Sequence, residues 1–266
     1  MSLGENAESG LLAVERQRII LEILEREGVV RNNELKDLLS VSTATIRSDL
    51  RELEKAGVCE IVWGGAVSKR FPVGDYGSRL QERSKLHPEA KRRIGARAAQ
   101  LVEVGQTIIV DAGTTTVELV HHLSRDLEYL RIVTPALNVA AAAAQFPNVE
   151  LFMTGGVLRH LTRSLIGPQV LRALELFNAD WVFLASGGFS IEHGVTTSNM
   201  LEVEVKRTMV QRAARVALMA DSSKFGQVRS LTVIPMSEVN VLITDTNLGD
   251  KETAALEELG VQVLRV

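Results

Sequence analysis

The stretch Ser40-Val41-Ser42-Thr43-Ala44-Thr45-Ile46-Arg47-Ser48-Asp49-Leu50 decides the fold of the first part of this chain. Its first three residues form a polar turn, and a helix is expected from about Thr43 to Ala56, where Gly57 ends it. Ile46, Leu50 and Leu53 recur at the spacing of one helix face, so we expect them to point inward.

Two more helices and a hairpin are expected around this segment. A first helix that stops at Gly28 is predicted by the helical spacing of Ile19, Ile20, Ile23 and Leu24. A second, short helix is capped by Asn32 or Asn33 and carries on one face Leu35, Leu38 and Leu39. Residues 58–62 and 66–70 are expected to form two strands around Gly64-Gly65. This order is the layout of a winged helix-turn-helix, mainly α with a β-hairpin.

The helix after the turn is the expected contact with double-stranded DNA, because the second helix of such a pair lies in the major groove. Its outward residues are small, hydroxylic or basic, as phosphate and base-edge contacts require: Ser42, Thr43, Thr45, Arg47, Ser48 and Arg51. A three-helix protein-interaction adaptor is the alternative. The net charge of −2 over residues 1–70 favours that alternative, although the first helix, which need not face DNA, carries the acids Glu15, Glu22, Glu25 and Glu27.

A family resemblance covers the same region. The segments 15–20, 35–42, 45–50, 53–57 and 64–67 resemble the DeoR family of bacterial transcription regulators, which implies sequence-specific binding to an operator duplex. Three positions depart from the family pattern. Ser48 stands where the family has a second arginine, and Glu60 and Trp63 replace an arginine and a histidine of the wing. Fewer cations mean fewer phosphate contacts, so we expect weaker affinity or a wing that meets its operator differently.

The second region alternates strands and helices. Short apolar runs predict strands at residues 106–111, 130–134, 149–154, 180–185, 215–220, 239–244 and 261–266. Helical segments are expected between them, among them 116–123, 136–145 and 200–213. Near-continuous apolar strands separated by helices indicate an α/β domain with a mostly parallel sheet covered by helices. Ligands bind such sheets at the carboxyl ends of the strands.

The first strand end gives the sharpest ligand signal. Asp111 is followed by Ala112, Gly113 and then Thr114-Thr115-Thr116, which open a helix. Glycine permits close approach of the backbone, and the N–H and hydroxyl groups suit a phosphate. The alternative is that Thr114 merely caps the helix. Other strand ends repeat small polar residues: Thr134, Thr154-Gly155-Gly156, Ser186-Gly187-Gly188 and Asp221-Ser222-Ser223-Lys224.

Residues 73–250 also resemble the DeoR-family sensor domain, which is similar in fold to ribose-5-phosphate isomerase and binds a phosphorylated sugar or related metabolite. The resemblance implies that residues 113–116 hold the phosphate and that Asp111, Glu202 and Lys224 meet sugar hydroxyls. With the other strand ends, the expected effector site is Asp111, Gly113, Thr114, Thr115, Thr116, Thr134, Thr154, Gly155, Gly156, Gly188, Glu202, Lys206, Asp221 and Lys224. Pro135 and Asn199 depart from the family pattern and leave the effector open.

The expected organisation is a DNA-binding domain at residues 1–70, a linker at 71–90 and an effector-binding domain at 91–266. We expect a homo-oligomer, dimer or tetramer, that presents two recognition helices. Coupling between effector and DNA is placed in the basic linker, whose cations are Arg79, Arg83, Lys85, Lys91, Arg92 and Arg93. A solvated helix face is an equally good interpretation of these cations.

Composition narrows the function class. Hydrophobic residues make up 45% of 266, which excludes a wholly disordered chain. A single cysteine, Cys59, excludes an intramolecular disulfide and fits a reducing compartment, so we expect a cytoplasmic protein without a membrane span or secretory signal. Five histidines show no zinc motif, and neither cofactor nor metal is expected. A sugar-phosphate isomerase using Asp111, Glu202 and Lys224 is the enzymatic alternative; the fused DNA-binding region favours a regulator.

Overall fold

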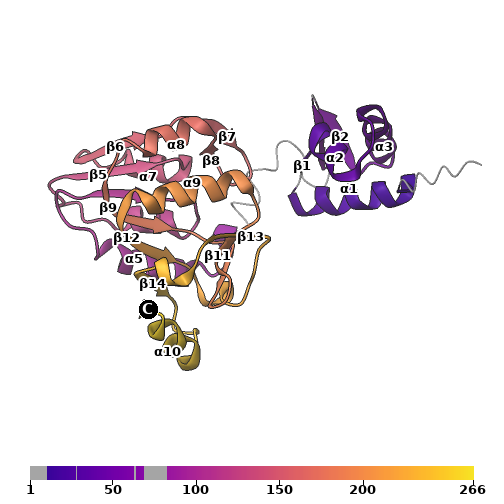
Figure 1. The fold of residues 1–266 in the computed structure, drawn as a ribbon. Helices are drawn as coiled ribbons and strands as arrows, with labels where there is room; N and C mark the ends of the chain where they lie inside the picture. Colours follow the sequence, from indigo (N-terminus) through magenta and orange to yellow (C-terminus); the bar gives the residue numbers. More distant parts are fainter. Residues whose placement is uncertain (1–10, 28, 63, 69–82) are drawn as a thin grey trace, which may run out of the picture. The chain divides into compact units, whose positions relative to one another are not determined.

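The computed structural model describes residues 11–27, 29–62, 64–68 and 83–266. The chain divides into two compact units, Met1–Ser78 and Arg79–Val266. Both units are drawn in Figure 1. Most of the expected linker at residues 71–90 lies outside the described residues, and its last residues already belong to a helix that begins at Pro88. The boundaries proposed from the sequence stay a prediction.

The first unit is a winged helix-turn-helix, as predicted. Its elements are α1 (Ala13–Glu27), β1 (Val29–Arg31), α2 (Asn32–Leu39), α3 (Thr43–Lys55), β2 (Cys59–Val62) and β3 (Gly65–Ser68). The strands pair antiparallel in the order β1-β3-β2. Ile20, Leu35, Ile46 and Leu50 meet in a common core, so the three helices pack through the predicted apolar faces.

Three details of this unit differ from the sequence prediction. Leu38 is 62% exposed, so only Leu35 and Leu39 face the core from α2. The residue at the N-cap of α2 is Arg31, without a side-chain cap bond, and Asn32 is buried inside the helix. Gly65 lies within β3 rather than in the turn, because β1, a strand the sequence did not predict, pairs with it. A Cβ there would stand 1.9 Å from the Val30 carbonyl oxygen, so only glycine fits.

The second unit is built on a seven-stranded sheet in which every neighbouring pair is parallel. The strand order is β15-β14-β12-β9-β4-β5-β6. The strands are β4 (Thr107–Val110), β5 (Leu130–Thr134), β6 (Val149–Met153), β9 (Ala179–Leu184), β12 (Ala213–Met219), β14 (Val241–Thr244) and β15 (Gln262–Arg265). All seven overlap the predicted segments, with ends that differ by at most two residues.

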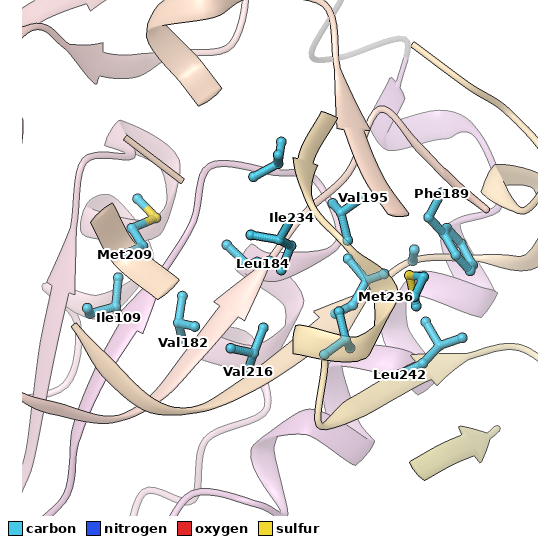
Figure 2. Close-up of a cluster of buried hydrophobic side chains, with 14 of the residues drawn as sticks. Ile109, Val182, Leu184, Phe189, Val195, Met209, Val216, Ile234, Met236 and Leu242 are labelled. Atoms are coloured by element: carbon cyan, nitrogen blue, oxygen red, sulfur yellow. The ribbon is translucent and has the colours of Figure 1, made fainter. Parts of the chain in front are cut away.

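Helices cover this sheet on both faces. They are α5 (Pro88–Ala99), α6 (Thr116–His121), α7 (Leu137–Ala143), α8 (Pro168–Leu174), α9 (Met200–Gln211) and α10 (Asp250–Glu258). Successive strand residues enter opposite layers: Ile108 and Val110 join the cluster formed with α5, α6 and α7, whereas Ile109 joins that of α8 and α9. Figure 2 shows Ile109 and Val182 near Met209 of α9 in the second cluster.

Shorter elements extend one end of this unit. An antiparallel sheet joins β10 (Gly188–Ser190), β11 (Gly194–Thr197) and β13 (Leu231–Ile234), and a hairpin joins β7 (Val157–Arg159) to β8 (Ser164–Ile166). Two 3-10 turns are η1 (Ser222–Lys224) and η2 (Met236–Glu238). Across the described part of the chain, no helix combines the length and apolar character needed to cross a lipid bilayer.

Candidate functional site

The outward face of α3 carries the residues expected to meet DNA. Arg47, Ser48 and Arg51 are exposed, whereas Thr43 and Thr45 are half-buried. Ser42 is the N-cap of the helix: its Oγ accepts a hydrogen bond of 3.1 Å from the Thr45 backbone N–H and lies 2.8 Å from the Thr45 hydroxyl. The cap hydroxyl therefore fixes the start of α3, and Arg47 and Arg51 are exposed cations that follow it.

An ion pair that sequence reasoning missed positions α3 against α1. The Arg16 guanidinium donates to both carboxylate oxygens of buried Asp49, at 2.7 and 3.1 Å. The hydrogen bond to Asp49 raises the pKa of Arg16 above its already high ordinary value. Asp49 falls on the inward face with Ile46 and Leu53. A carboxylate on an apolar face was the available signal for a buried partner.

The wing is tied to the same helix. The Ile61 backbone N–H in β2 donates to the Glu54 carboxylate of α3 at 2.7 Å. Glu60, the unusual acid of the wing, is exposed. Trp63 lies outside the described residues, so its expected effect on operator contact stays a prediction.

In the second unit, Asp111 stands at the centre of the carboxyl end of the sheet. Its carboxylate accepts from the backbone N–H of Ala112 at 2.8 Å and of Ala185 at 2.9 Å, and from the ammonium of Lys206. Lys206 also donates to the Ala185 carbonyl at 2.8 Å. Asp111 and Lys206 are both buried. The structure thus brings two predicted site residues together as an internal ion pair that links β4, β9 and α9.

The loop after Asp111 presents backbone donors. The N–H groups of Gly113, Thr114 and Thr115 have no acceptor among the described residues. Gly113 is packed tightly, because a Cβ there would lie 2.8 Å from that of Ala185. The Asn138 side-chain amide donates to the Gly113 carbonyl at 2.9 Å, which orients the loop. This arrangement leaves N–H groups available to an anion.

The hydroxyls of Thr116 and Thr134 serve the fold. Thr116 donates to the Asp111 carbonyl and Thr134 to the Val110 carbonyl, each at 2.7 Å, and neither residue is exposed. By contrast, the Ser186 hydroxyl and the Asn138 amide oxygen are buried without a partner among the described residues. Both lie in segments that follow strands at this edge. Unpaired buried polar atoms are rare, and they mark a place where a further polar group fits.

Two lysines gather at the neighbouring end of β12. Burial lowers the pKa of Lys224, while the negative charge of Asp221 opposes that shift and Arg83 and Arg229 add to it. Burial likewise lowers the pKa of Lys91, which also feels Asp221, Lys224 and Glu118 of α6. The sequence placed Lys91 among linker cations; the structure buries it on α5 beside the candidate site.

Carboxylate hydrogen bonds hold the loop that carries Lys224. The Asp245 carboxylate accepts from the Ser222 N–H at 2.7 Å, the Ser222 hydroxyl at 2.9 Å and the Asn247 N–H at 3.0 Å. Burial alone would raise the pKa of Asp245, but these hydrogen bonds outweigh it and hold the pKa below its ordinary value. The Ser223 hydroxyl donates to Asp221 in the same turn.

The remaining predicted residues lie in three other segments. Glu202 pairs with Arg159 at 3.1 Å and accepts from the Thr197 hydroxyl at 2.9 Å; among the described residues, no hydrogen bond or ion pair joins it to Asp111. Thr154 is buried, and Gly155 and Gly156 adopt positive φ angles of 67° and 116°. Gly188 lies against the Gln227 backbone, where a Cβ would stand 2.1 Å from the carbonyl oxygen. Their part in effector binding stays a prediction.

Metal binding has no support in the described ranges, where no group of three or more His, Cys, Asp or Glu side chains is arranged to hold an ion.

Comparison with known proteins now assigns both units. The DeoR-like helix-turn-helix domain model matches residues 16–70, and the DeoR C terminal sensor domain model matches residues 86–246. The chain belongs to the DeoR family. It is therefore a DNA-binding transcription regulator and not an enzyme, which settles the isomerase alternative.

Relatives of this DeoR-family chain match nearly from end to end. The HTH-type transcriptional regulator GlpR from Haloferax volcanii is 36% identical and aligns over 96% of this chain and 98% of that protein. The regulator YulB from Bacillus subtilis is 34% identical, again over 96% and 98%. A protein of Escherichia coli O157:H7 whose name describes an aga operon transcriptional repressor is 32% identical over 95% and 93%.

Solved structures give weaker likenesses. The full-length sorbitol operon regulator SorC from Klebsiella pneumoniae covers 91% of this chain and 98% of that chain at 13% identity, with a TM-score of 0.46. Ribose 5-phosphate isomerase A from Neisseria gonorrhoeae covers 53% and 54% at 12% identity, with a TM-score of 0.37. At these scores neither likeness carries a functional argument; the fold rests on the strand order and helices described above.

Proposed function

We propose that this DeoR-family regulator is a repressor of carbohydrate-metabolism genes and that a phosphorylated sugar bound by its second unit weakens operator binding. One observation carries the sensor part: unpaired N–H groups of residues 113–115, the buried Lys91 and the half-buried Lys224 lie at the carboxyl end of one sheet. The repressor part is supported by the name of the aga operon relative, which describes a transcriptional repressor.

The chemistry of this edge fits a phosphate. A phosphate monoester carries a charge of about −1.5 to −2 near pH 7 and three acceptor oxygens. Backbone N–H groups and ammonium groups bind such an anion through charge-assisted hydrogen bonds. Asp111 is already neutralised by Lys206, so the paired carboxylate adds little repulsion. Sugar hydroxyls would then meet the carboxylates of Asp221 and Glu202.

The first unit supplies the operator contact. Arg47 and Arg51 are exposed on α3 and free to meet base edges and phosphates. A homo-oligomer, dimer or tetramer, would present two such helices to half-sites about 34 Å apart or a multiple of that distance. The effector must bind one arrangement of this assembly better than the other, because equal affinity shifts nothing.

Arg47→Ala tests the DNA-binding assignment. We expect operator affinity to fall by about fivefold or more, since a base contact is worth about 1–3 kcal/mol. An operator duplex is first obtained by selection from random sequences with the wild-type protein, and affinity is then measured by fluorescence anisotropy at fixed salt. Lys55→Ala, an exposed cation at the other end of α3, is the matched control. Equal affinity of Arg47→Ala and wild type would remove α3 from the interface.

Thermal melting tests the sensor assignment. A panel of phosphorylated sugars is compared with the unphosphorylated parents, and a ligand at about 100 times its Kd should stabilise the protein by roughly 2.7 kcal/mol. Stabilisation by one phosphate but not by its parent sugar supports the proposal. A protein-interaction adaptor would show neither this response nor salt-dependent DNA binding. Sedimentation of the operator complex reports the oligomer.

A further inference from the structure

Lys91 makes a contact that the sensor site does not need. Its buried ammonium donates a hydrogen bond to the backbone carbonyl of Arg83, eight residues earlier. The same carbonyl accepts from the Leu86 N–H at 3.3 Å. Arg83 begins the described part of the second unit, a few residues after the chain has left the first unit. A residue of the effector site therefore tethers the segment that continues toward the DNA-binding unit.

The tethered segment ends in a strained residue. His87, the N-cap of α5, has a φ of 50° and a ψ of 48°, a left-handed conformation that costs free energy for a residue other than glycine. The His87 carbonyl accepts from the Lys91 backbone N–H at 3.1 Å. Lys91 thus holds residues 83–87 twice, through its backbone at His87 and through its side chain at Arg83. Loss of the side-chain bond removes one of these two contacts from Lys91.

The charges around Lys91 make that side-chain bond replaceable. A lysine ammonium has three N–H donors, and a carbonyl oxygen is a neutral acceptor. Asp221 attracts Lys91, whereas Lys224 and Arg83 repel it. An anionic group entering beside Lys224 would offset this repulsion. It would also offer charged acceptors, whose hydrogen bonds are roughly twice as strong as neutral ones.

We propose that Lys91 is the residue through which effector binding reaches the DNA-binding unit. An anionic group held at Lys224 and residues 113–115 takes the Lys91 ammonium from the Arg83 carbonyl, and residues 83–87 are released from α5. This inference rests on the phosphate site proposed above and adds to it the route of regulation.

Hydrogen exchange of the full chain, followed by mass spectrometry over residues 83–87, measures the tether directly. Inorganic phosphate is the probe, with chloride at matched ionic strength as its control. We expect exchange in this segment to become at least tenfold faster in phosphate, although phosphate raises the melting temperature of the protein. Lys91→Gln should show the fast exchange without phosphate and no further response. Lys85→Gln, an exposed lysine of the same segment, should behave as wild type.

The outcomes separate this inference from the proposed function. Lys91→Arg keeps the cation, and we expect protection of residues 83–87 to be restored in that variant. If phosphate raises the melting temperature of the wild-type protein but does not change hydrogen exchange of residues 83–87, the role proposed for Lys91 is wrong and the sensor assignment stands. The role proposed for Lys91 is also wrong if residues 83–87 of Lys91→Gln exchange as slowly as those of the wild-type protein. Absence of stabilisation by phosphate and by every phosphorylated sugar overturns both proposals.

Discussion

Thr115 is a residue of the candidate phosphate loop whose hydroxyl is not used by the fold. It is 8% exposed and its hydroxyl makes no hydrogen bond among the described residues. We expect Thr115→Val to weaken the effector response at least tenfold, since a hydrogen bond to a charged group is worth about 1.5–3 kcal/mol. Operator affinity without effector should not change. Effector titrations of the operator complex measure the effector response and the operator affinity. Thr232→Val, at an exposed position of β13, is the control. Unchanged effector sensitivity of Thr115→Val would remove Thr115 from the site.

Asp245 gives a prediction that depends on pH. Because the folded pKa of Asp245 is lowered, its stabilising effect is fully present above the ordinary Asp pKa of about 3.9 and is lost as the pH falls through the folded value. Asp245→Asn should lower the free energy of unfolding by about 1–3 kcal/mol at neutral pH. The difference from wild type should shrink in acid.

Urea unfolding of wild type and variant across this pH range measures that difference. Asp126→Asn, a change of the same kind at an exposed position, is the control and should have little effect. A deficit in Asp245→Asn that stays constant as the pH falls would mean that the carboxylate charge does not stabilise the loop.

Some site residues were open to prediction and others were not. Asp111 was marked by its place directly after an apolar strand, and the structure puts it at the sheet edge as expected. The burial of Lys91 could not be predicted, because an isolated lysine in a basic stretch gives no sign of burial. The Arg16–Asp49 pair joins residues 33 positions apart, and no local pattern pairs them.

At the scale of the element, the N-cap of α3 is the feature with a measurable energy. Ser42→Ala removes the hydroxyl that accepts from Thr45 N–H, and cap loss typically costs about 1 kcal/mol. We therefore expect the α3 amides to exchange about fivefold faster with solvent deuterium. Ser48→Ala, on the exposed middle of the same helix, should leave the rates near wild type. Equal rates in the two variants would show that another contact fixes the helix start.

The strands and helices differ in how well they can be predicted from the sequence. The seven strands of the main sheet are short apolar runs because both faces are covered, and all were predicted. The strands β1, β7, β8, β10, β11 and β13 have only three or four residues and were missed, since so short a segment shows no period. The α5 helix was not assigned for another reason: its buried face is Lys91, Ile94, Gly95 and Ala98, in which Ile94 is the single large apolar residue.

At the scale of the whole molecule, each unit has its own core. Leu50→Ala should destabilise the first unit by about 2–5 kcal/mol, because it opens a cavity between the three helices. Stabilisation of the second unit by a phosphorylated sugar should survive. Calorimetry of the full chain with and without the sugar phosphate checks this, with Leu38→Ala at an exposed α2 position as control. Loss of the sugar-phosphate response in Leu50→Ala would mean that the units unfold as one.

Cys59 allows opening of the first unit to be measured by thiol labelling. It is the sole cysteine of the chain, it is fully buried in β2, and its thiol donates to the Leu50 carbonyl at 3.7 Å. A thiol-reactive dye reaches the Cys59 thiol only when this unit opens. The labelling rate therefore measures opening of the DNA-binding unit and does not report on the sensor unit. Operator DNA, by binding the closed unit, should slow labelling in proportion to its occupancy. Affinity for any duplex is then readable from unmodified protein and unlabelled DNA.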